Sequence, residues 1–398
     1  MTDVTLHTRY RLTRVINAAG TMTTLGASIV VPEAISAAAA IEKHFVRMSE
    51  LQARASEAIA KATGAEAGYV TACSAAGISL AVAASMTGCN LARIERLPDS
   101  GGLNDEIVIQ SGHRINYGAP IDQAIRLAGA RVVAAGSAAV VEPYHLEDAI
   151  TSRTAAVLHV VSHHTVQEGP LPLVEVIAIA RARGVPVIVD MASEYDLNGP
   201  IAMGAGLAIY SAHKFLGGLT AGIVAGNKDL VRSCYLQNRG IGRSMKVGKE
   251  SVLATIAALD AWQARDHSAA RQRELAIVAN WQAMLAGVPG VTCNRHADWT
   301  GNPIDRLELS IGTDAGLFAW ELADRLAAGD PAICIRDDLA EQGLLYLDPC
   351  NIQADDAASV GAAIRSHIDS ARRLRDGHRI SWQERRSLAL QSILRWPD

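Results

Sequence analysis

The sequence VPVIVD at residues 185–190 is a continuous apolar run that ends in an acid. YSAHKFLGG at residues 210–218 continues the next apolar run and carries a lysine. Continuous apolar runs are typical of strands buried on both faces, as in a parallel sheet covered by helices. From about residue 65 to 226 such runs alternate with amphipathic helical segments. The pattern therefore predicts a doubly wound, mainly parallel α/β sheet.

The predicted elements follow this alternation and then change character. We expect strands at 68–71, 106–110, 131–135, 155–161, 185–189, 207–210 and 223–225, and helices at 74–86, 119–128, 144–150 and 173–183. A long helical stretch at 251–285 leads into a smaller α+β part, with strands at 307–311 and 332–336 and helices at 317–327, 357–375 and 381–398. The sequence predicts a large domain over residues 1–250 and a linking helix with a small domain over 251–398.

Composition limits the class of protein. The chain has 398 residues, is 49% hydrophobic and only 4% aromatic, and carries a net charge of −4. This composition favours a large aliphatic core and argues against a disordered chain. The slightly acidic net charge argues against a surface that binds nucleic acid. Six scattered cysteines without C-x-x-C spacing, and the lack of a signal or membrane segment, indicate a cytoplasmic protein with reduced thiols.

Three predicted strand ends carry chemically unusual residues, and ligands bind at such ends in open α/β sheets. Around Ser74, Ala75 and Ala76, small residues open a helix and form a candidate phosphate cup; the alternative is a core helix capped by Ser74. Asp190 is a buried carboxylate that needs a partner. Lys214 lies beside apolar residues, which predicts a reactive amine able to form a Schiff base. The alternative for Asp190 is a helix N-cap or a salt-bridged acid in the following loop, and the alternative for Lys214 is a lysine that extends from the sheet edge into solvent.

The order of these features is more specific than each feature alone. A phosphate cup, then an acid, then a lysine 24 residues further on is the chain order of pyridoxal 5′-phosphate enzymes of fold type I. In that arrangement the cup anchors the phosphate, Asp190 holds the ring nitrogen protonated, and Lys214 carries the aldehyde. We therefore predict pyridoxal phosphate as the cofactor.

Several segments resemble a known family. RVINAAGT at 14–21, NDEIVIQSGHR at 104–114, 190–218 and GRSMKVGKE at 242–250 resemble bacterial selenocysteine synthase, and more closely its smaller relatives, the D-glucosaminate-6-phosphate ammonia-lyases. The resemblance covers roughly residues 10–350. Because the matching motif starts near Met1, without the tRNA-binding domain of selenocysteine synthase, and the chain is acidic, we expect no nucleic-acid partner. His213 departs from these relatives and is similar to class V aminotransferases, in which such a histidine contacts the cofactor phosphate.

The resemblance also implies roles for other residues. His113 or Tyr117 is expected to stack on the cofactor ring, and Ser162 or one of the next two histidines, His163 and His164, to contact its 3-oxygen. Ser211 belongs to the same cofactor-binding group. We expect the side chains of His163 and His164 to point apart, which disfavours a metal site.

Basic residues are the candidates for substrate binding. Arg336 lies where fold type I enzymes commonly place the arginine that binds the substrate carboxylate, a task that suits a planar, bidentate donor. Arg243, Lys246 and Lys249 form a basic cluster that is expected to bind a substrate anion or the cofactor phosphate of a neighbouring subunit. Ordinary surface salt bridges and a solvated charged face are the respective alternatives.

The expected reaction begins with removal of the Cα proton of an amino acid or amino sugar acid by Lys214. Loss of a β-hydroxyl then gives a 2-oxo acid and ammonia, which makes the protein a lyase. A racemase or epimerase, with Cys73, His113 or Tyr117 as second acid, and an aldolase, with His163 or His164 near the β-hydroxyl, remain open. So does a non-catalytic cofactor-binding protein. The resemblance further implies a homodimer or larger homo-oligomer, and we expect no membrane partner.

Overall fold

The computed structural model describes residues 4–353, 355–374 and 380–397 and divides the chain into two compact units. The large unit is Ile29–Arg265, and the small unit combines Met1–Ser28 with Asp266–Asp398. Compared with the predicted division at residue 250, the first 28 residues pack with the carboxyl-terminal part, and helix α11 (Lys249–Ala264) packs with the large unit. The assignment of functional domains to these parts stays a prediction.

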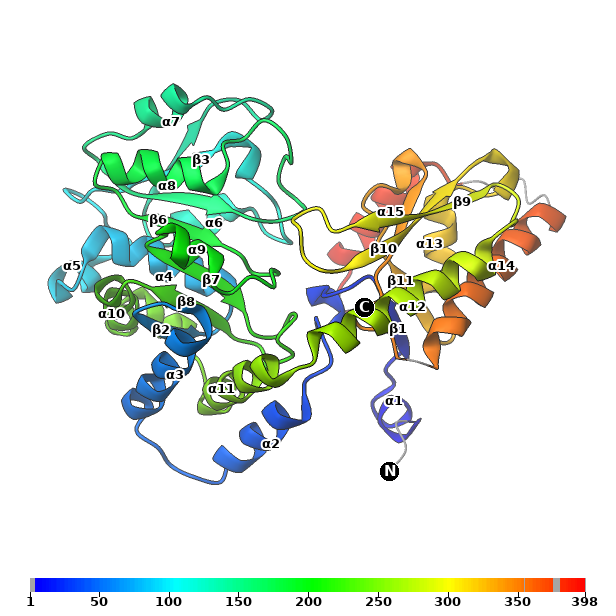
Figure 1. The fold of residues 1–398 in the computed structure, drawn as a ribbon, viewed down its shortest axis with the longest axis horizontal. Coiled ribbons are helices and arrows are strands. Elements are labelled where there is room, and N and C mark those ends of the chain that lie inside the picture. Colours follow the sequence, from blue (N-terminus) through cyan, green and yellow to red (C-terminus); the bar gives the residue numbers. More distant parts are fainter. Residues whose placement is uncertain (1–3, 354, 375–379, 398) are drawn as a thin grey trace. The chain divides into compact units, whose positions relative to one another are not determined.

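A seven-stranded sheet in the order β2-β8-β7-β6-β5-β3-β4 forms the centre of the large unit (Figure 1). Its strands are β2 (Ala67–Thr71), β3 (Glu106–Gln110), β4 (Arg131–Ala135), β5 (Thr154–Val160), β6 (Val187–Asp190), β7 (Leu207–Ser211) and β8 (Gly222–Gly226). The five strands from β7 to β4 pair in parallel, and β8 is antiparallel to both of its neighbours. The predicted mainly parallel α/β sheet is confirmed.

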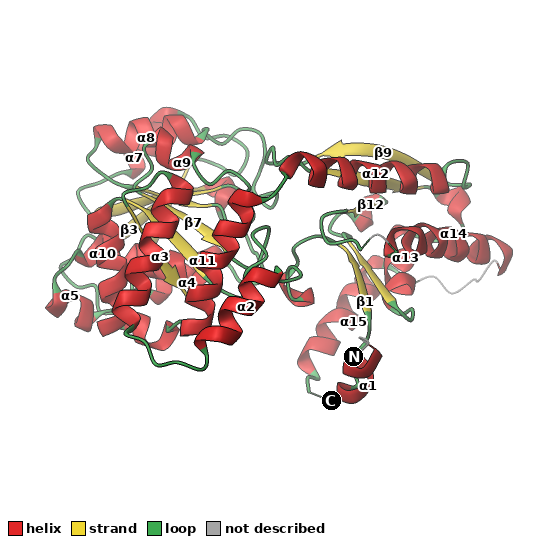
Figure 2. Ribbon diagram, turned by 60° about the horizontal axis from the view of Figure 1, so that its bottom comes forward, coloured by secondary structure: helices red, strands yellow, loops and turns green. Residues whose placement is uncertain are grey.

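Both faces of this sheet are buried, which explains the continuous apolar runs. Ile107 and Ile109 belong to the core on one face, whereas Val108 belongs to the core on the other. The first core includes residues of α4 (Ser74–Thr87), α6 (Ile121–Leu127) and α10 (Lys228–Leu236), and Leu97, directly after α5 (Leu91–Arg96), also belongs to it. The second includes residues of α2 (Pro32–Ile41), α3 (Met48–Thr63), α7 (Pro143–Ala149), α8 (Leu173–Ala182) and α11, and α2 and α3 both pack on α11 (Figure 2). A short helix, α9 (Gly199–Met203), precedes β7.

The small unit holds two further sheets. β1 (Val15–Ala18) pairs in parallel with β11 (Ala332–Ile335), and β9 (Val291–Ala297), β10 (Asp305–Ile311) and β12 (Leu344–Leu347) form an antiparallel sheet in the order β12-β10-β9. The core of this unit includes residues of α12 (His267–Leu285), α13 (Ala319–Ala327) and α14 (Asp356–Leu374). Trp281 is fully buried there and donates its indole N–H to the carbonyl of Ala357 at 2.8 Å.

The predicted helical stretch at 251–285 is two helices rather than one. α11 ends at Ala264, and Asp266 begins a new helix because its carboxylate accepts a hydrogen bond from the N–H of Ala269 at 2.9 Å. Two further helices lie near the ends of the chain, α1 (Val4–Tyr10) and α15 (Trp382–Leu394). Residues 375 and 398, the predicted ends of the last two helices, lie outside the described residues. Within the described part of the chain, no helix has the length and apolarity needed to span a membrane.

Candidate active site

Asp190 ends strand β6 as a buried carboxylate with one unsatisfied oxygen. Its side chain is 5% exposed, and Oδ1 has no hydrogen-bond partner among the described residues. Burial raises the pKa of Asp190 to about 6, although the charge of Lys214 and the backbone N–H of Ala192 act in the opposite direction. A buried carboxylate oxygen without a donor is costly. This position therefore suits a ligand that brings a cationic N–H group.

Lys214 lies beside Asp190, in the turn that follows strand β7. Its Nζ atom donates a hydrogen bond to the hydroxyl oxygen of Ser193 at 2.6 Å, and its charge influences the pKa of Asp190. In this turn Gly217 adopts a φ of +66°, and a Cβ atom there would lie 2.9 Å from Val31, so a glycine is required. The two residues separated by 24 positions in the sequence are thus neighbours at one edge of the sheet.

Ser193 is a site residue that the sequence did not reveal. It lies three residues beyond Asp190, in the loop that leaves the same strand end, and it accepts the hydrogen bond of Lys214. A serine in a strand-end loop is common, so residue type carries no specific signal. Its position at the carboxyl end of a parallel strand was the one available indication.

Ser211 and His213 form a pair next to the lysine. The Ser211 hydroxyl lies 3.0 Å from Nδ1 of His213, and Ser211 is buried at the end of β7. Burial, followed by the positive charge of Lys214, lowers the pKa of His213. Both effects favour the neutral imidazole, whose Nδ1 lies within hydrogen-bond distance of the serine hydroxyl.

The predicted phosphate cup lies at the start of helix α4. The N-cap is Cys73 rather than Ser74, because the Cys73 sulfur accepts a hydrogen bond from the N–H of Ala76 at 3.4 Å. The N–H groups of Ser74 and Ala75 belong to the first turn and have no intrahelical acceptor. A Cβ atom at Gly222 on β8 would lie 2.4 Å from the Cys73 carbonyl group, so the sheet packs closely against this turn.

His113 and Tyr117 differ in their surroundings. His113 is 4% exposed, its Nδ1 accepts the N–H of Val160 at 3.1 Å, and its ring packs edge-on against His159 at 4.5 Å. Burial lowers the pKa of His113 to about 4. Tyr117 is half-buried, and burial together with the charges of Asp190 and Cys73 raises its pKa to about 12. Tyr117 therefore lies within electrostatic range of Asp190 and remains protonated.

The loop after β5 holds Ser162, His163 and His164. The Ser162 hydroxyl accepts the backbone N–H of His164 at 3.2 Å. The expectation that the two histidine side chains point apart is wrong, because their ring centroids are 3.9 Å apart. The bend of the loop brings them together. Among the described residues, no group of three or more histidine, cysteine or acidic side chains is arranged to hold a metal ion.

The basic cluster of residues 243–249 is only partly available to a ligand. Arg243 and Lys246 are exposed, in and just after a short 3-10 helix. Lys249 instead donates to the backbone carbonyls of Glu42 and His44, at 3.2 and 2.8 Å. The first two remain candidates for anion binding, whereas Lys249 holds the end of helix α2.

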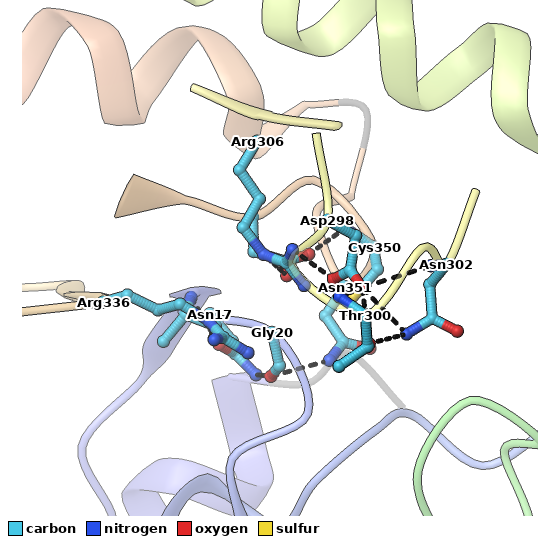
Figure 3. A network of polar contacts seen from close by, with 11 residues as sticks. Asn17, Gly20, Asp298, Thr300, Asn302, Arg306, Arg336, Cys350 and Asn351 are labelled. Atoms are coloured by element: carbon cyan, nitrogen blue, oxygen red, sulfur yellow. Dashed lines mark hydrogen bonds and ion pairs between the residues drawn. The ribbon is translucent and has the colours of Figure 1, made fainter. Parts of the chain in front are cut away.

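Arg336 belongs to the small unit, where it follows strand β11. It is 7% exposed, and its Nε atom donates to the carbonyl oxygen of Ala19 at 2.9 Å (Figure 3). The guanidinium carbon lies 5.8 Å from the ring centre of Trp299. No acceptor for its terminal nitrogens is found among the described residues.

Residues 15–287 match the family model described as SelA, L-seryl-tRNA selenium transferase, over more than half of the chain. The chain belongs to this family. The site described above lies within the matched region, whereas Arg336 lies beyond it.

Two curated relatives extend the comparison beyond the family model. A D-glucosaminate-6-phosphate ammonia lyase of Salmonella typhimurium is 37% identical over 90% of this chain and 97% of its own length. A 5′-C-glycyluridine monooxygenase-decarboxylase of a Streptomyces species is 38% identical over 87% of this chain and 88% of its own. The names of these two relatives describe different reactions.

Solved structures show the same relationship at the level of the fold. A D-glucosaminate-6-phosphate ammonia-lyase is 35% identical, covers 92% of this chain and 98% of its own, and superposes with a TM-score of 0.83. An aspartate aminotransferase of Thermus thermophilus, only 14% identical with a TM-score of 0.54, shares the fold alone. The chain therefore has the α/β fold of fold type I pyridoxal-phosphate enzymes.

Proposed function

We propose that this chain is a pyridoxal-phosphate-dependent lyase that converts an amino acid or amino sugar acid with a β-hydroxyl into a 2-oxo acid and ammonia. The observation that carries the proposal is the buried, unsatisfied oxygen of Asp190 beside Lys214. The name of the ammonia lyase relative, which is 37% identical over almost its whole length, supports this reaction over others.

The residues at the strand ends fit the cofactor. The first turn of α4, at Ser74, Ala75 and Ala76, is proposed to hold the phosphate, with the N–H groups of Ser74 and Ala75 as donors because that of Ala76 is bound to Cys73. Asp190 offers its oxygen to a protonated ring nitrogen. Lys214 offers the amine for covalent attachment, and the bound cofactor would supply an electron sink for the substrate's Cα. The remaining cofactor contacts that we propose come from His113, Ser162, His164, Ser211 and His213, with Tyr117 as a second candidate for the ring face.

The proton chemistry then falls to this chain's own side chains. Lys214 takes the Cα proton, and Ser193, which already accepts a hydrogen bond from Nζ, orients the amine. Asp190 remains charged while it pairs with a cationic partner, because such a partner lowers its pKa. Loss of the Cα proton and the β-hydroxyl amounts to loss of water, and hydrolysis of the product releases ammonia.

Three basic residues are proposed to bind the substrate's anionic groups. Arg336 has terminal nitrogens suited to a carboxylate, and Arg243 and Lys246 are exposed cations suited to a second anion. The relative's name includes a sugar acid that carries both a carboxylate and a phosphate. We therefore propose a phosphorylated amino sugar acid as the first substrate to test.

Incubation of the purified protein with a panel of D- and L-amino acids and amino sugar acids, D-glucosaminate 6-phosphate among them, tests the reaction. Ammonia together with a 2-oxo acid is the expected result. Solvent deuterium at an inverted Cα would indicate a racemase or epimerase, and a released aldehyde an aldolase. Uptake of oxygen with release of carbon dioxide would indicate the chemistry named for the Streptomyces relative. Any of these three alone would contradict the lyase proposal.

Lys214→Ala tests the covalent attachment and separates an enzyme from a mere cofactor-binding protein. We expect the visible absorbance of bound cofactor to lose its covalent component and activity to fall by about 10²–10⁴-fold. Ser193→Ala is the graded companion, because it removes the hydrogen-bond partner but keeps the amine. An unchanged absorbance band in Lys214→Ala would overturn the assignment.

We also propose that the protein is cytoplasmic and forms a homodimer or larger homo-oligomer. The six cysteines are all unpaired thiols, which supports a reducing compartment. Exposed apolar side chains in the segment between α2 and α3, such as Phe45 and Val46, support association of subunits. Sedimentation velocity of the purified protein tests this, and a monomer at micromolar concentration would contradict it.

A further inference from the structure

The turn that follows strand β1 holds Arg336 in place. β1 pairs with β11 in parallel, with Ala18 opposite Ile335, so the Ala19 carbonyl meets the side chain of Arg336. Asn17 fixes this turn, because its Oδ1 accepts the N–H of Ala19 at 2.9 Å and its Nδ2 donates to the carbonyl of Gly20 at 2.8 Å. The conspicuous motif at residues 14–21 therefore anchors a buried arginine.

Gly20 keeps space for this arrangement. It has a φ of +86°, and a Cβ atom would lie 2.7 Å from Oδ2 of Asp348 and 3.4 Å from a terminal nitrogen of Arg336. Any side chain at this position would push into the gap between the carboxylate and the guanidinium. Arg336 and Asp348 are thus close neighbours, yet no salt bridge joins them among the described residues.

A second buried arginine occupies the carboxylates instead. Arg306, with a side chain 3% exposed, pairs through Nε with Oδ2 of Asp348 at 2.7 Å and through a terminal nitrogen with Asp298 (Figure 3). The other oxygen of Asp348 accepts the N–H of Cys350 at 3.0 Å. Asp298 is likewise satisfied by hydrogen bonds from Thr300 and by Asn302. Both carboxylates are therefore engaged without Arg336.

Trp299 lies beside both cations. Its ring centre is 5.1 Å from the guanidinium carbon of Arg306 and 5.8 Å from that of Arg336, distances at which a cation interacts favourably with an aromatic ring. The ring supports both guanidinium groups without using their hydrogen-bond donors. Arg336 is left with donors that no described residue uses.

We propose that Arg306 is a positioning residue: by binding Asp348 and Asp298, it prevents Asp348 from pairing with Arg336 and keeps the terminal nitrogens of Arg336 for a substrate carboxylate. The inference rests on the proposed function for the identity of that carboxylate. Without Arg306, a buried Asp348 would need another cation, and Arg336 is the neighbour that can supply one. A bidentate internal salt bridge would then compete directly with the substrate.

The test uses sodium D-gluconate, a sugar acid without an amino group, titrated calorimetrically into the cofactor-loaded protein. Arg336→Gln should weaken its binding by about tenfold or more, because a charge-assisted hydrogen-bond pair is lost. Arg306→Lys keeps the positive charge but cannot hold two carboxylates in the same geometry. It should weaken gluconate binding by about tenfold as well, since the released Asp348 pairs with Arg336.

The double variant Arg306→Lys/Asp348→Asn is the decisive comparison. It removes the competing carboxylate while the lysine introduced in place of Arg306 still faces Asp298, so binding should recover to within about threefold of the wild type. A merely structural role of Arg306 predicts that the second substitution leaves binding as weak as before or weakens it further. That outcome, or wild-type binding in Arg306→Lys, would overturn the proposal.

Two readouts separate this inference from the lyase proposal. Gluconate cannot be deaminated, so its binding depends on the carboxylate site and not on the reaction. If the substrate panel identifies another reaction but the gluconate series behaves as described, the role of Arg306 stands. With a substrate in hand, Arg306→Lys should raise KM about tenfold while kcat changes by less than about threefold, because the lost contact is made equally before and during the reaction.

Discussion

Asp190 and Asp348 are both carboxylates buried at the end of a strand, but their environments differ. Asp348, 1% exposed, faces Arg306 and the N–H of Cys350, and although burial alone would raise its pKa, Arg306 and Arg336 lower it. Asp190, 5% exposed, has one oxygen without a partner among the described residues, and burial raises its pKa to about 6. The same burial is thus offset by an arginine at Asp348, whereas at Asp190 it leaves an oxygen without a donor among the described residues, and the proposed cofactor site rests on that difference.

The two arginines of the small unit repeat this difference with opposite charge. Burial lowers the pKa of Arg306, but Asp348 and Asp298 outweigh it and the net shift is upward. For Arg336, burial dominates and the pKa is lowered. Arg306 is thus paired with two acids, whereas the terminal nitrogens of Arg336 have no acceptor among the described residues.

The largest expected effect is a loss of stability on substitution of Asp348, the carboxylate that is paired with Arg306. Asp348→Ala leaves Arg306 short of a partner in the interior and should lower the free energy of unfolding by about 3–5 kcal/mol. Denaturant titration followed by tryptophan fluorescence measures this, because Trp281 and Trp299 both lie in the small unit.

Asp324→Ala is the matched control, because its pair with Arg385 at 2.8 Å is much more exposed. A surface pair of this kind contributes less than about 1 kcal/mol. If both variants lose the same free energy of unfolding, then the burial of the ion pair between Asp348 and Arg306 is not what makes Asp348 important for stability.

The next largest effect is a loss of turnover on substitution of Asp190, the carboxylate with one oxygen that has no partner among the described residues. Asp190→Asn should lower kcat by about 10²–10³-fold, because a charge directed at the reacting system is removed. Steady-state assays with the substrate found in the panel measure it. Asp196→Asn, the same substitution at an exposed position in the same loop, should leave kcat unchanged. Comparable losses at both positions would contradict a special role of Asp190.

The smallest effect has the opposite sign and concerns the protein depleted of cofactor. Because the pKa of Asp190 is raised from 3.8 to about 6, ionisation above that pH opposes folding. Asp190→Asn should therefore stabilise the depleted protein at pH 8 by up to roughly 3 kcal/mol, and the gain should shrink as the pH falls from about 6 to 3.8, so that only a small part of it remains near pH 4. Melting temperatures at the two pH values measure it, and destabilisation at pH 8 would refute it.

The part of the site that depends on strand ends could be predicted from the sequence. Asp190 and Lys214 follow two neighbouring parallel strands, so their chain order places them at one edge without knowledge of side-chain contacts. Ser193 could not be found in this way, because the loop path decides which residue meets the lysine. A similar limit applies to the helix cap, which the sequence predicts at Ser74 and the structure places at Cys73. The two residues are adjacent, and only the backbone conformation decides which of them precedes the first helical residue.

The polar network of the small unit could not be predicted from the sequence. Arg306 and Asp348 are 42 positions apart, and Arg336 meets Ala19 across 317 positions. No local periodicity links such residues, and a surface role is the usual one for each. The segment 14–21 carries a family resemblance in its sequence, whereas its contact with Arg336 exists only in the packed structure.

The placement of β1 also bears on the order in which the chain folds. Ile29–Arg265 is continuous and can complete its packing as soon as that segment has been synthesised. β1 precedes this segment in the chain but pairs with β11, which follows it, so β1 must wait for β11 to be made before it finds its partner. Closing so long a loop is entropically costly and makes this pairing a late step. The turn after β1 can therefore hold Arg336 in place only after β11 has been made, later than the large unit.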